Sequence, residues 1–299
     1  MTLEQLRIFV AVAERLHMTR AAEVLNLTQS AASAAVAALE TRYGAKLFDR
    51  VGRGLVLSDA GAAFLPEARA VLAHAAAAAQ ALDDLAGLKR GRVVIHASQT
   101  IASYWLASRL ARFAGAHPQV ILDLHVGNTT QVARAVREGE ADLGFVEGRL
   151  EDDQLNRTRV GADQLVVVAA AGHPLARRHT GPGRATAAEL LACGWVMREE
   201  GSGTRSEFER ALVGLGMDAA ALVVRLSLPS NEAVLGAVAS GDMLSAVSDL
   251  AAAPLIAAGH IAALHMDLPE RGFDLLTDRR RHRSRAAAAF VEALYPKHR

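Results

Sequence analysis

The sequence contains one cysteine, Cys193, and aromatic residues make up only 4% of its 299 residues. A single cysteine excludes an intrachain disulfide and favours a reducing compartment, so we expect a cytoplasmic protein in which Cys193 is a small buried hydrophobe beside Trp195. No stretch of about 18 uncharged apolar residues is present, so we expect no membrane span. The amphipathic N-terminus does not have the pattern of a signal peptide. The net charge is only +1, so any nucleic-acid surface must be local.

Catalytic and metal-binding patterns are also missing. The 11 histidines include no HExxH pair, and one cysteine cannot form a thiolate zinc site. There is no Walker loop, and Ser202 within "GSG" lacks the surroundings of a nucleophile elbow. Glu147 follows an expected strand and is a candidate acid or base, but it has no evident partner. We therefore predict no catalytic residue, no metal and no cofactor, and an enzyme that uses Glu147 ranks last among the hypotheses.

The sequence is rich in apolar residues, which make up 51% of the chain and include much alanine. This share is enough for a sizeable core and favours helices. The N-terminal spacing of apolar residues predicts a first helix, which Thr2 and Gln5 begin as a capping box. A second short helix is expected at Thr19–Leu25 and ends at Asn26. A third begins near Thr28 and continues to about Tyr43, where Gly44 stops it.

Three short helices with a tight turn before the last predict a helix-turn-helix, in which the front of the last helix enters the DNA major groove. The third helix carries its polar residues at this front end, namely Thr28, Gln29, Ser30 and Ser33. The Gln29 amide can form a bidentate hydrogen bond with adenine, and the hydroxyls can form hydrogen bonds with base edges or phosphates. The alternative is that Thr28 is only an N-cap and that its neighbours form a solvated first turn.

The segment "LFDRVGRGLVLS" predicts a β-hairpin wing with Arg50 and Arg53 at its tip. Arginines at this place suit phosphate or minor-groove contact, although a solvated turn would carry charge as well. Thr19 and Arg20, at the start of the second helix, complete the predicted set of DNA-binding residues.

One long helix is predicted from Ser58 to about Ala86, with a length of about 43 Å. Its apolar residues alternate four and three apart and form a heptad seam of Phe64, Ala68, Val71, Ala75, Ala78, Leu82 and Leu85. A seam of this length is too apolar for a lone exposed helix. We interpret it as a dimerisation helix, because a protein that binds DNA as a two-fold symmetric dimer needs a dimer interface. The alternative is that this helix packs on its own domain.

From about residue 90 onward, strand-like apolar runs alternate with helical segments, which predicts an α/β fold with a parallel sheet. Strands are expected at Val93–His96, Val120–Val126, Leu143–Val146, Gln164–Ala170, Trp195–Met197, Val223–Ser227, Met243–Val247, His260–His265 and Phe273–Thr277. Helices are expected at Thr100–Ala116, Asn128–Glu138 and Ala286–Tyr295, and also from Thr204 and from Ser230. Two similar lobes fit a segment of this length better than one sheet does.

Small polar residues gather where expected strands lead into helices, at Ser98–Thr100, Gly127–Thr130, Gly201–Ser206 and Ser230–Asn231. In α/β sheets, ligands bind beyond the carboxyl ends of strands, at helix N-termini. Four such junctions predict a cleft for a small anion, to which Arg205 would add charge. The alternative is that Ser98, Asn128, Thr204 and Ser230 are ordinary N-caps, although capping accounts for only one residue per junction.

The most specific stretch is "LEQLRIFVAVAERLHMTRAAEVLNLTQSAASAAVAALETRYGAKLFDRVGRGLVLSDAGAAF". It resembles the N-terminal pattern of LysR-type transcriptional regulators, and the likeness covers essentially the whole chain. The matching positions are Phe9, Ala21, Ala22, Leu25, Gln29, Ser30, Ser33, Leu39, Glu40, Gly44, Leu47, Phe48, Arg50, Ala60 and Gly61. Met18 departs from the pattern, because the family more often has a small polar residue before the position of Thr19.

The resemblance implies an N-terminal all-α winged helix-turn-helix with a long linker helix, followed by a two-lobed α/β effector domain like the periplasmic binding proteins. We place the DNA-binding domain at 1–58, the linker helix at 59–89 and the effector domain at 90–299. Within the effector domain, lobe I is expected at about 92–162 and 267–299, and lobe II at about 163–266. The resemblance also implies antiparallel pairing of linker helices, a homodimer or homotetramer, and inverted-repeat operators in double-stranded DNA. RNA polymerase is a further expected partner.

Within the family, "ASQTIASYWL", "HVGNTTQV", "DLGFVEG" and "EGSGTR" look like the branch that regulates sulfur assimilation or carbon dioxide fixation. Members of that branch sense sulfite, sulfate-like oxyanions or phosphorylated metabolites. Carried over to matching positions, the residues lining the effector cleft would be Ser98, Gln99, Thr100, Asn128, Thr129, Glu147, Gly203, Thr204 and Arg205.

Glu147 is unfavourable opposite a dianion, because like charges repel unless the acid is protonated or paired. We therefore expect it either to select a hydrogen-bearing ligand or to pair with Arg205. The main alternative for the whole chain is a solute-binding protein with a helical N-terminal extension. The polar front of the third helix and the lack of a signal-peptide pattern argue against that alternative.

Overall fold

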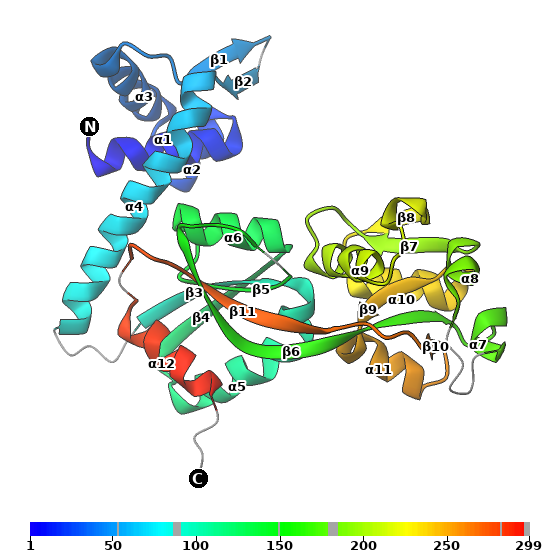
Figure 1. Cartoon of the computed structure of the whole chain (residues 1–299). Helices are drawn as coiled ribbons and strands as arrows, with labels where there is room; N and C mark the ends of the chain where they lie inside the picture. Colours follow the sequence, from blue (N-terminus) through cyan, green and yellow to red (C-terminus); the bar gives the residue numbers. More distant parts are fainter. Residues whose placement is uncertain (53, 86–90, 149, 179–184, 282, 296–299) are drawn as a thin grey trace. The chain divides into compact units, whose positions relative to one another are not determined.

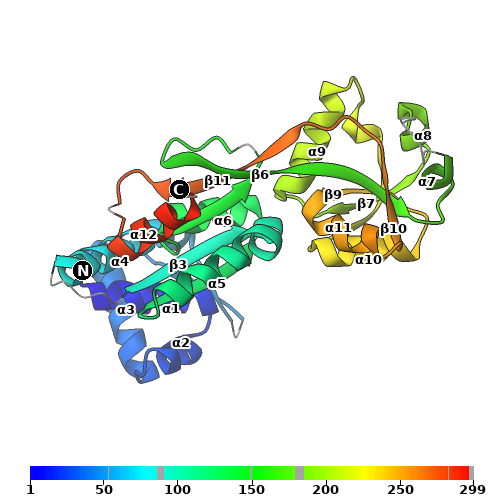
Figure 2. The same cartoon turned by 90° about the horizontal axis from the view of Figure 1, so that it is seen from below.

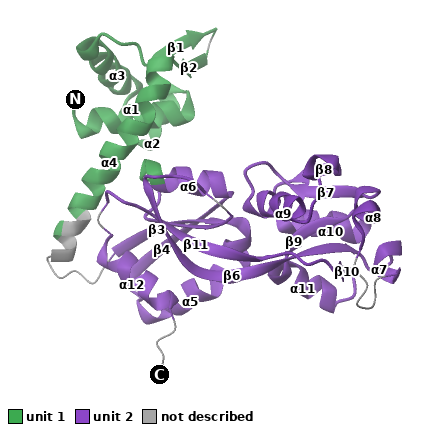
Figure 3. Ribbon diagram, viewed as in Figure 1, with its two compact units in different colours: residues 1–88, 137–140 green, residues 89–136, 141–299 purple. Residues whose placement is uncertain are grey.

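The computed structural model describes residues 1–52, 54–85, 91–148, 150–178, 185–281 and 283–295 (Figure 1). They form two compact units (Figure 3), one of residues 1–88 and 137–140 and the other of residues 89–136 and 141–299. Among the helices described, none is both long and apolar enough to cross a membrane.

The described part of the first unit consists of α1 (Leu3–Arg15), α2 (Met18–Val24), α3 (Gln29–Tyr43), β1 (Phe48–Val51), β2 (Gly54–Leu57) and α4 (Asp59–Leu85). The predicted capping box begins α1, since the Thr2 hydroxyl accepts from Gln5 N at 3.2 Å and the Gln5 side chain accepts from Thr2 N at 3.0 Å. Phe9 is fully buried at the centre of this unit, and its ring packs against Phe48 and Phe64.

The turn between α2 and α3 depends on Asn26, whose φ of 55° is left-handed. α2 begins one residue earlier than predicted, because the His17 side chain caps it by accepting from Arg20 N. Thr28 is the N-cap of α3, and α3 ends at Gly44, which has a φ of 65°. The predicted helix-turn-helix is therefore present.

The predicted wing is an antiparallel hairpin, in which Phe48 pairs with Leu57 and Val51 with Gly54. Glu40 of α3 fixes the base of this hairpin, because its Oε1 accepts from Leu47 N at 2.7 Å and from Phe48 N at 3.3 Å. Arg53 lies outside the described residues.

The second unit is built on a mixed sheet in the order β10-β6-β11-β5-β3-β4, with β9 also paired to β6. Its described elements are β3 (Gly91–Ser98), η1 (Ile101–Leu106), α5 (Ala107–Ala116), β4 (Val120–Gly127), α6 (Thr129–Glu138), β5 (Leu143–Glu147), β6 (Leu155–Ala170), α7 (Pro174–Arg178), α8 (Ala187–Leu191), β7 (Gly194–Arg198), α9 (Gly203–Gly214), η2 (Ala219–Ala221), β8 (Val223–Leu228), α10 (Asn231–Ser240), β9 (Ser245–Ser248), α11 (Asp249–Ala257), β10 (Ile261–Leu264), β11 (Glu270–Asp278) and α12 (Arg285–Leu294).

Two long strands join the lobes of this unit. β6 and β11 run antiparallel from one lobe into the other (Figures 1 and 2), with register from Leu155 opposite Asp278 to Gln164 opposite Glu270. In one lobe, α5 and α12 pack on one face of the sheet around Phe145 and Phe290, and α6 packs on the other face. In the other lobe, α9 packs around Trp195 and Phe208, whereas α10 and α11 cover the opposite side.

The α/β prediction is confirmed, but several details of it are wrong. The sheet is mixed rather than parallel, because β11 pairs antiparallel with both β5 and β6. β6 begins at Leu155 instead of Gln164, since its first half is rich in charged residues that mask the strand pattern. The helix expected from Thr100 opens with the π-helical turn η1, and α11 was not predicted. Cys193 is half-buried rather than buried, and partial burial raises the pKa of its thiol.

Candidate functional site

The first candidate site is the exposed front of α3. Thr28, Gln29 and Ser30 are exposed there, and Ser33 is half-buried one turn later. The Thr28 hydroxyl accepts from Ala31 N at 3.2 Å, so the N-cap reading is correct for this residue. Capping does not occupy the other polar groups of the turn, because Gln29 Nε2 donates to Ser33 Oγ at 2.8 Å and remains at the surface.

The other predicted DNA-binding residues lie on neighbouring elements of the same unit. Thr19 and Arg20 are exposed in the first turn of α2, and Arg50 is exposed on β1 of the wing. Hydroxyl, amide and guanidinium groups at a surface are the side chains that contact phosphates and base edges. This arrangement has the chemistry that a groove of DNA requires.

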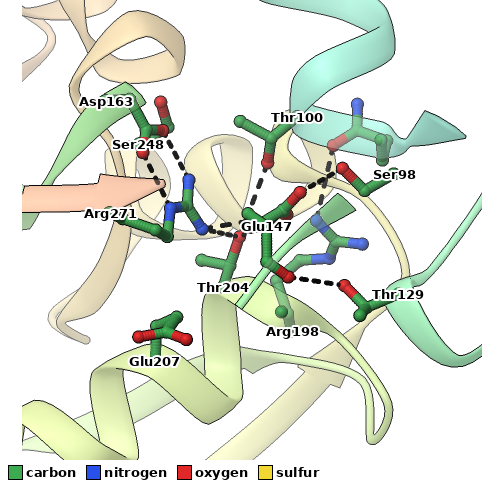
Figure 4. Close-up of polar contacts among 12 residues, drawn as sticks. Ser98, Thr100, Thr129, Glu147, Asp163, Arg198, Thr204, Glu207, Ser248 and Arg271 are labelled. Atoms are coloured by element: carbon green, nitrogen blue, oxygen red, sulfur yellow. Dashed lines mark hydrogen bonds and ion pairs between the residues drawn. The ribbon is translucent and has the colours of Figure 1, made fainter. Parts of the chain in front are cut away.

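The second candidate site is a buried polar cluster between the lobes of the second unit (Figure 4). At its centre lies Glu147, the last residue of β5, which is 1% exposed. Ser98 donates a hydrogen bond to Glu147 Oε2, and Thr204 donates to Oε1 at 3.4 Å. The N-terminus of α9, where Thr204 is the second residue, also favours negative charge. The donors that the sequence predicted for an anion therefore surround a carboxylate of the protein itself.

Arg271 is the cation of this cluster and was missed by the sequence analysis. Its Nη1 lies 3.7 Å from Glu147 Oε1 and donates to Thr204 Oγ1 at 2.8 Å (Figure 4). Its Nε and Nη2 bind both oxygens of Asp163, at 2.8 and 2.5 Å. Burial lowers the pKa of Arg271, but the bonds to Asp163 and the charge of Glu147 outweigh burial and raise it. Arg271 is therefore charged and faces two carboxylates.

The pairing of Glu147 with Arg205 that the sequence suggested is wrong. Arg205 instead donates from Nε to Glu209, one turn further along α9, at 2.8 Å and from Nη1 to the carbonyl of Arg198 at 3.4 Å. An i, i+4 partner on the same helix is close regardless of the tertiary fold. Arg271 lies 124 positions after Glu147 in the sequence, and the antiparallel register of β11 with β5, in which Phe273 lies opposite Glu147, brings the two together. The sequence carried no local signal for this pair.

Hydrogen bonds also join the two lobes directly. Thr100 is fully buried and accepts from Asn231 Nδ2 at 3.0 Å, and its hydroxyl lies 3.5 Å from that of Thr204. Gln99 Oε1 accepts from Asn231 N at 3.1 Å, and Gln99 Nε2 donates to Glu232 at 2.8 and 3.0 Å. Thus the junction after β3 is tied to the N-terminus of α10.

Glu232 lies at the edge of this cluster, on the first turn of α10. The Tyr104 hydroxyl donates to it at 2.8 Å. Partial burial raises the pKa of Glu232, but hydrogen bonds from its own backbone, Tyr104, Gln99 and Ser230 together lower it. Burial and the same carboxylate raise the pKa of Tyr104. Glu232 is therefore ionised and holds Tyr104 as a protonated donor at neutral pH.

The N-cap alternative applies to some of the predicted cleft residues and not to others. Asn128 Oδ1 accepts from Gln131 N at 3.0 Å, and Ser230 Oγ accepts from Ala233 N at 3.1 Å, so both cap a helix. The hydroxyls of Ser98 and Thr204 bind Glu147 instead, and Thr129 donates to the Glu147 carbonyl at 2.9 Å. Capping thus explains the rim of the cluster but not its centre.

Gly203 allows the two lobes to approach at this place. A Cβ atom on Gly203 would lie 2.2 Å from the Glu147 carbonyl oxygen and 2.6 Å from Thr129 Oγ1. Real Cβ contacts of that length do not occur, so only glycine lets the start of α9 reach the end of β5.

A pocket of about 230 Å³ opens beside the buried cluster. It is lined by residues of both lobes, among them Gln99, Gly127, Asn128, Gln131 and Arg198. Arg198 is 3% exposed and donates from Nε and Nη2 to the two carboxylate oxygens of Glu199 and from Nη1 to Gln99 and Asn231. Arg198, like Arg271, is not among the residues predicted from the sequence. Among the described residues, no group of three or more His, Cys, Asp or Glu could hold a metal ion.

Two family models match the chain. The model "Bacterial regulatory helix-turn-helix protein, lysR family" matches residues 3–62, and the model "LysR substrate binding domain" matches residues 86–298. The "Uncharacterized HTH-type transcriptional regulator YeiE" of Escherichia coli (strain K12) is 34% identical, over 99% of this chain and 97% of that protein. The "HTH-type transcriptional regulator CbbR" of Rhodospirillum rubrum is 32% identical, over 98% of this chain and 95% of that protein.

Solved structures give the same result for the fold. CbnR complexed with its target DNA superposes with a TM-score of 0.69 at 20% identity, covering 98% of this chain and 99% of that chain. The regulatory domain of CcmR from Synechocystis PCC6803, in complex with 2-PG, has a TM-score of 0.61 at 28% identity and covers 69% of this chain and 96% of that chain. These relatives are regulators, so neither the enzyme hypothesis nor the solute-binding hypothesis finds support among them.

Proposed function

The chain belongs to the LysR family of bacterial transcriptional regulators, and we propose that a small oxyanion bound between the lobes of its second unit sets its activity on DNA. We assign DNA binding to residues 1–58, pairing of subunits to 59–89 and effector binding to 90–299. The exposed front of α3 and Arg50 of the wing would contact an inverted-repeat operator, with one DNA-binding domain on each half-site. The paired chains would form a homodimer or homotetramer.

The observation that carries the effector proposal is the environment of Glu147. Its carboxylate is held by two hydroxyls and faces a charged guanidinium at a helix N-terminus. Such a ring of donors is suited to an oxyanion, and here it holds one that belongs to the chain. A dianion that bound beside Glu147 would be repelled by its like charge. An oxyanion that carries a proton could instead donate a hydrogen bond to this carboxylate. We therefore favour a protonated oxyanion of the hydrogen-sulfite type.

A phosphorylated metabolite is the second candidate, and the adjacent pocket favours it. That pocket of about 230 Å³ is larger than a four-atom oxyanion requires, and Arg198, Asn128 and Gln131 line it. The CcmR regulatory domain, 28% identical to this chain, was solved in complex with 2-PG. In this version of the proposal, the phosphate would bind in the pocket and Glu147 would stay in its present position.

Thermal denaturation of the full-length protein against sulfite, sulfate, thiosulfate, phosphate and phosphorylated sugars separates the two candidates. A ligand at 100 times its dissociation constant adds about 2.7 kcal/mol of stability, which is easily measured. We expect a shift with sulfite and none with sulfate, and we expect Glu147→Gln to admit sulfate because it removes the like charge. A shift with phosphorylated sugars that survives Glu147→Gln but is lost in Asn128→Ala would favour the second candidate. If no anion shifted the midpoint of thermal denaturation, the oxyanion proposal would be refuted, but the assignment of DNA binding to the first unit would still stand.

A further inference from the structure

Tyr104 extends from one lobe of the second unit into the other. It lies in η1, the π-helical turn after β3, and so belongs to the lobe that contains α5, here called the α5 lobe. Its ring packs against the apolar cluster of the lobe that contains α10, here called the α10 lobe, in which Val234 and Leu235 are buried. Its hydroxyl donates to Glu232 on the first turn of α10 at 2.8 Å. Tyr104 therefore contacts the α10 lobe through both its ring and its hydroxyl.

Glu232 links Tyr104 to Gln99 at the pocket. Besides the tyrosine hydroxyl, its carboxylate accepts from Gln99 Nε2, at 3.0 Å to Oε1 and at 2.8 Å to Oε2. Gln99 Oε1 in turn accepts from Asn231 N at 3.1 Å and from Arg198 Nη1 at 3.4 Å. A carboxylate only accepts and a backbone N–H only donates, so these partners fix which way the Gln99 amide faces. The described lining of the pocket includes Gln99 and Arg198 but neither Tyr104 nor Glu232.

The pocket keeps its shape only while the two lobes keep their present arrangement. Asn128 lines it from the α5 lobe, and Arg198 and Glu199 line it from the α10 lobe. Where β6 and β11 pass between the lobes, residues 162–164 pair with residues 270–272, and no other described strand pairs with either segment. A two-stranded ribbon has little rigidity of its own, and a few residues of such a connection can act as a hinge. Contacts between side chains of the two lobes must therefore hold the pocket at its present width.

We propose that Tyr104 and Glu232 form a latch that holds the lobes in the arrangement in which the pocket exists. They are positioning residues, because they do not line the pocket but hold Gln99 and the α10 lobe in place. The inference rests on the proposed binding of an anion between the lobes and adds the contact that controls the affinity for that anion. Without the latch, the lobes occupy other arrangements part of the time, and the apparent affinity falls with the fraction that still has the pocket.

Hydrogen exchange of the ligand-free, full-length protein tests the latch directly. The amide of Asn231 donates across the lobes to Gln99, so its exchange reports their separation. In Tyr104→Phe, which removes the hydroxyl and keeps the ring, we expect faster exchange at residues 230–235 and unchanged exchange in β5 and β7, which lie inside the lobes. Tyr295→Phe, at an exposed position of the same unit, should match the wild type. Faster exchange throughout the unit, or unchanged exchange at residues 230–235, would overturn the proposal.

Affinity for an anion tests what the latch does. Calorimetric titration of the full-length protein with sulfite and with inorganic phosphate gives a dissociation constant for each. For an anion that the wild type binds, we expect Tyr104→Phe to bind about three-fold more weakly, as it would if the latched arrangement fell to about one third of the population. Tyr295→Phe should bind as the wild type does. An unchanged affinity in Tyr104→Phe would contradict the proposal.

A double variant shows whether the Tyr104 hydroxyl acts through Glu232. Glu232→Ala removes the acceptor of both Tyr104 and Gln99, so we expect it to weaken anion binding more than Tyr104→Phe does. Tyr104→Phe added to Glu232→Ala should cause no further loss, because the hydroxyl then has no partner. Additive losses would show that the two residues act separately and would refute the latch. If the wild type binds neither anion, the proposed function fails, and the exchange measurement still decides whether Tyr104 holds the lobes together.

Discussion

The two candidate sites use similar side chains in opposite surroundings. At the front of α3, Gln29 and Ser30 are exposed and bind only neighbours on the same helix. Between the lobes, Ser98 and Thr204 are buried and bind Glu147, which comes from another part of the chain. The first site leaves its hydrogen-bonding groups available to a large partner. The second site is already satisfied, so a ligand there must displace or reorganise contacts of the protein.

This difference predicts different responses to mutation. A surface side chain contributes little to stability, and its loss appears in binding. A buried charge that loses its partner remains without water and without a counter-charge, so removal of the partner lowers the free energy of unfolding. Matched substitutions at buried and at exposed positions therefore test whether the two sites differ in this way.

The largest effect is expected from Arg271→Met. This change leaves the carboxylates of Asp163 and Glu147 buried without their cation, and breaking a buried pair in this way costs about 3–5 kcal/mol. The control is Arg159→Met on the same pair of strands, where the partner Glu270 is exposed and the ion pair is worth about 0–1 kcal/mol. Urea unfolding of both variants measures the difference. Equal losses of stability would contradict the contrast between buried and exposed sites.

The next effect is expected from Gly203→Ala. The new methyl group would lie 2.2 Å from the Glu147 carbonyl oxygen, so α9 must move away from β5, at a cost of about 1–3 kcal/mol. Gly214→Ala, at the other end of α9, is the matched control because no atom lies within 4 Å of its Cβ position. There alanine should stabilise the helix by about 0.5–1 kcal/mol. If both variants unfold at the wild-type midpoint, the close approach of the lobes is not present in solution.

A smaller effect on stability is expected at the front of α3. Thr28→Ala removes an N-cap and should cost about 1 kcal/mol. Gln29→Ala should change stability by less than about 0.5 kcal/mol. In DNA binding, however, it should cost about 1–3 kcal/mol for the preferred operator, because a bidentate base contact is lost. Fluorescence anisotropy with operator and scrambled DNA measures the change in binding free energy. An equal loss of affinity for both sequences would show that Gln29 makes no base-specific contact.

The smallest effect concerns pH. His96 and His125 stack on neighbouring strands of the second unit, with ring centroids 4.8 Å apart. Burial, followed by the charge of His125, lowers the pKa of His96 below its ordinary value of 6.5. As the pH falls, His96 is therefore protonated in the unfolded chain at a higher pH than in the folded protein. The contribution of neutral His96 to the free energy of unfolding is fully present above about pH 6.5 and is lost as the pH falls toward the folded pKa. Between about pH 7.5 and about pH 5.5, His96→Gln should lose less stability than the wild type. His265→Gln, at an exposed position, should behave as the wild type does.

The sequence predicted the first unit well, because its signals are local. Thr2, Asn26, Thr28 and Gly44 each determine a helix end through their own backbone or side chain. The second unit was predicted only in outline, because its centre depends on long-range pairing. Arg271 reaches Glu147 through the register of β11 with β5, and nothing near either residue in the sequence indicates the other. The sequence could therefore place Ser98, Glu147 and Thr204 in one cleft, but it could not predict the hydrogen bonds among them or the guanidinium of Arg271.

We propose above all that an oxyanion bound in the second unit controls the affinity of the first unit for DNA. The most direct test measures the affinity of the full-length protein for the DNA upstream of its own gene, with and without sulfite, at two salt concentrations. We expect salt-sensitive binding, since arginines neutralise phosphates, and an affinity that changes at least five-fold when sulfite is present, a change of about 1 kcal/mol in coupling. In Glu147→Gln, sulfate should produce the change as well. Salt-sensitive binding that no oxyanion or phosphorylated sugar alters would contradict the account.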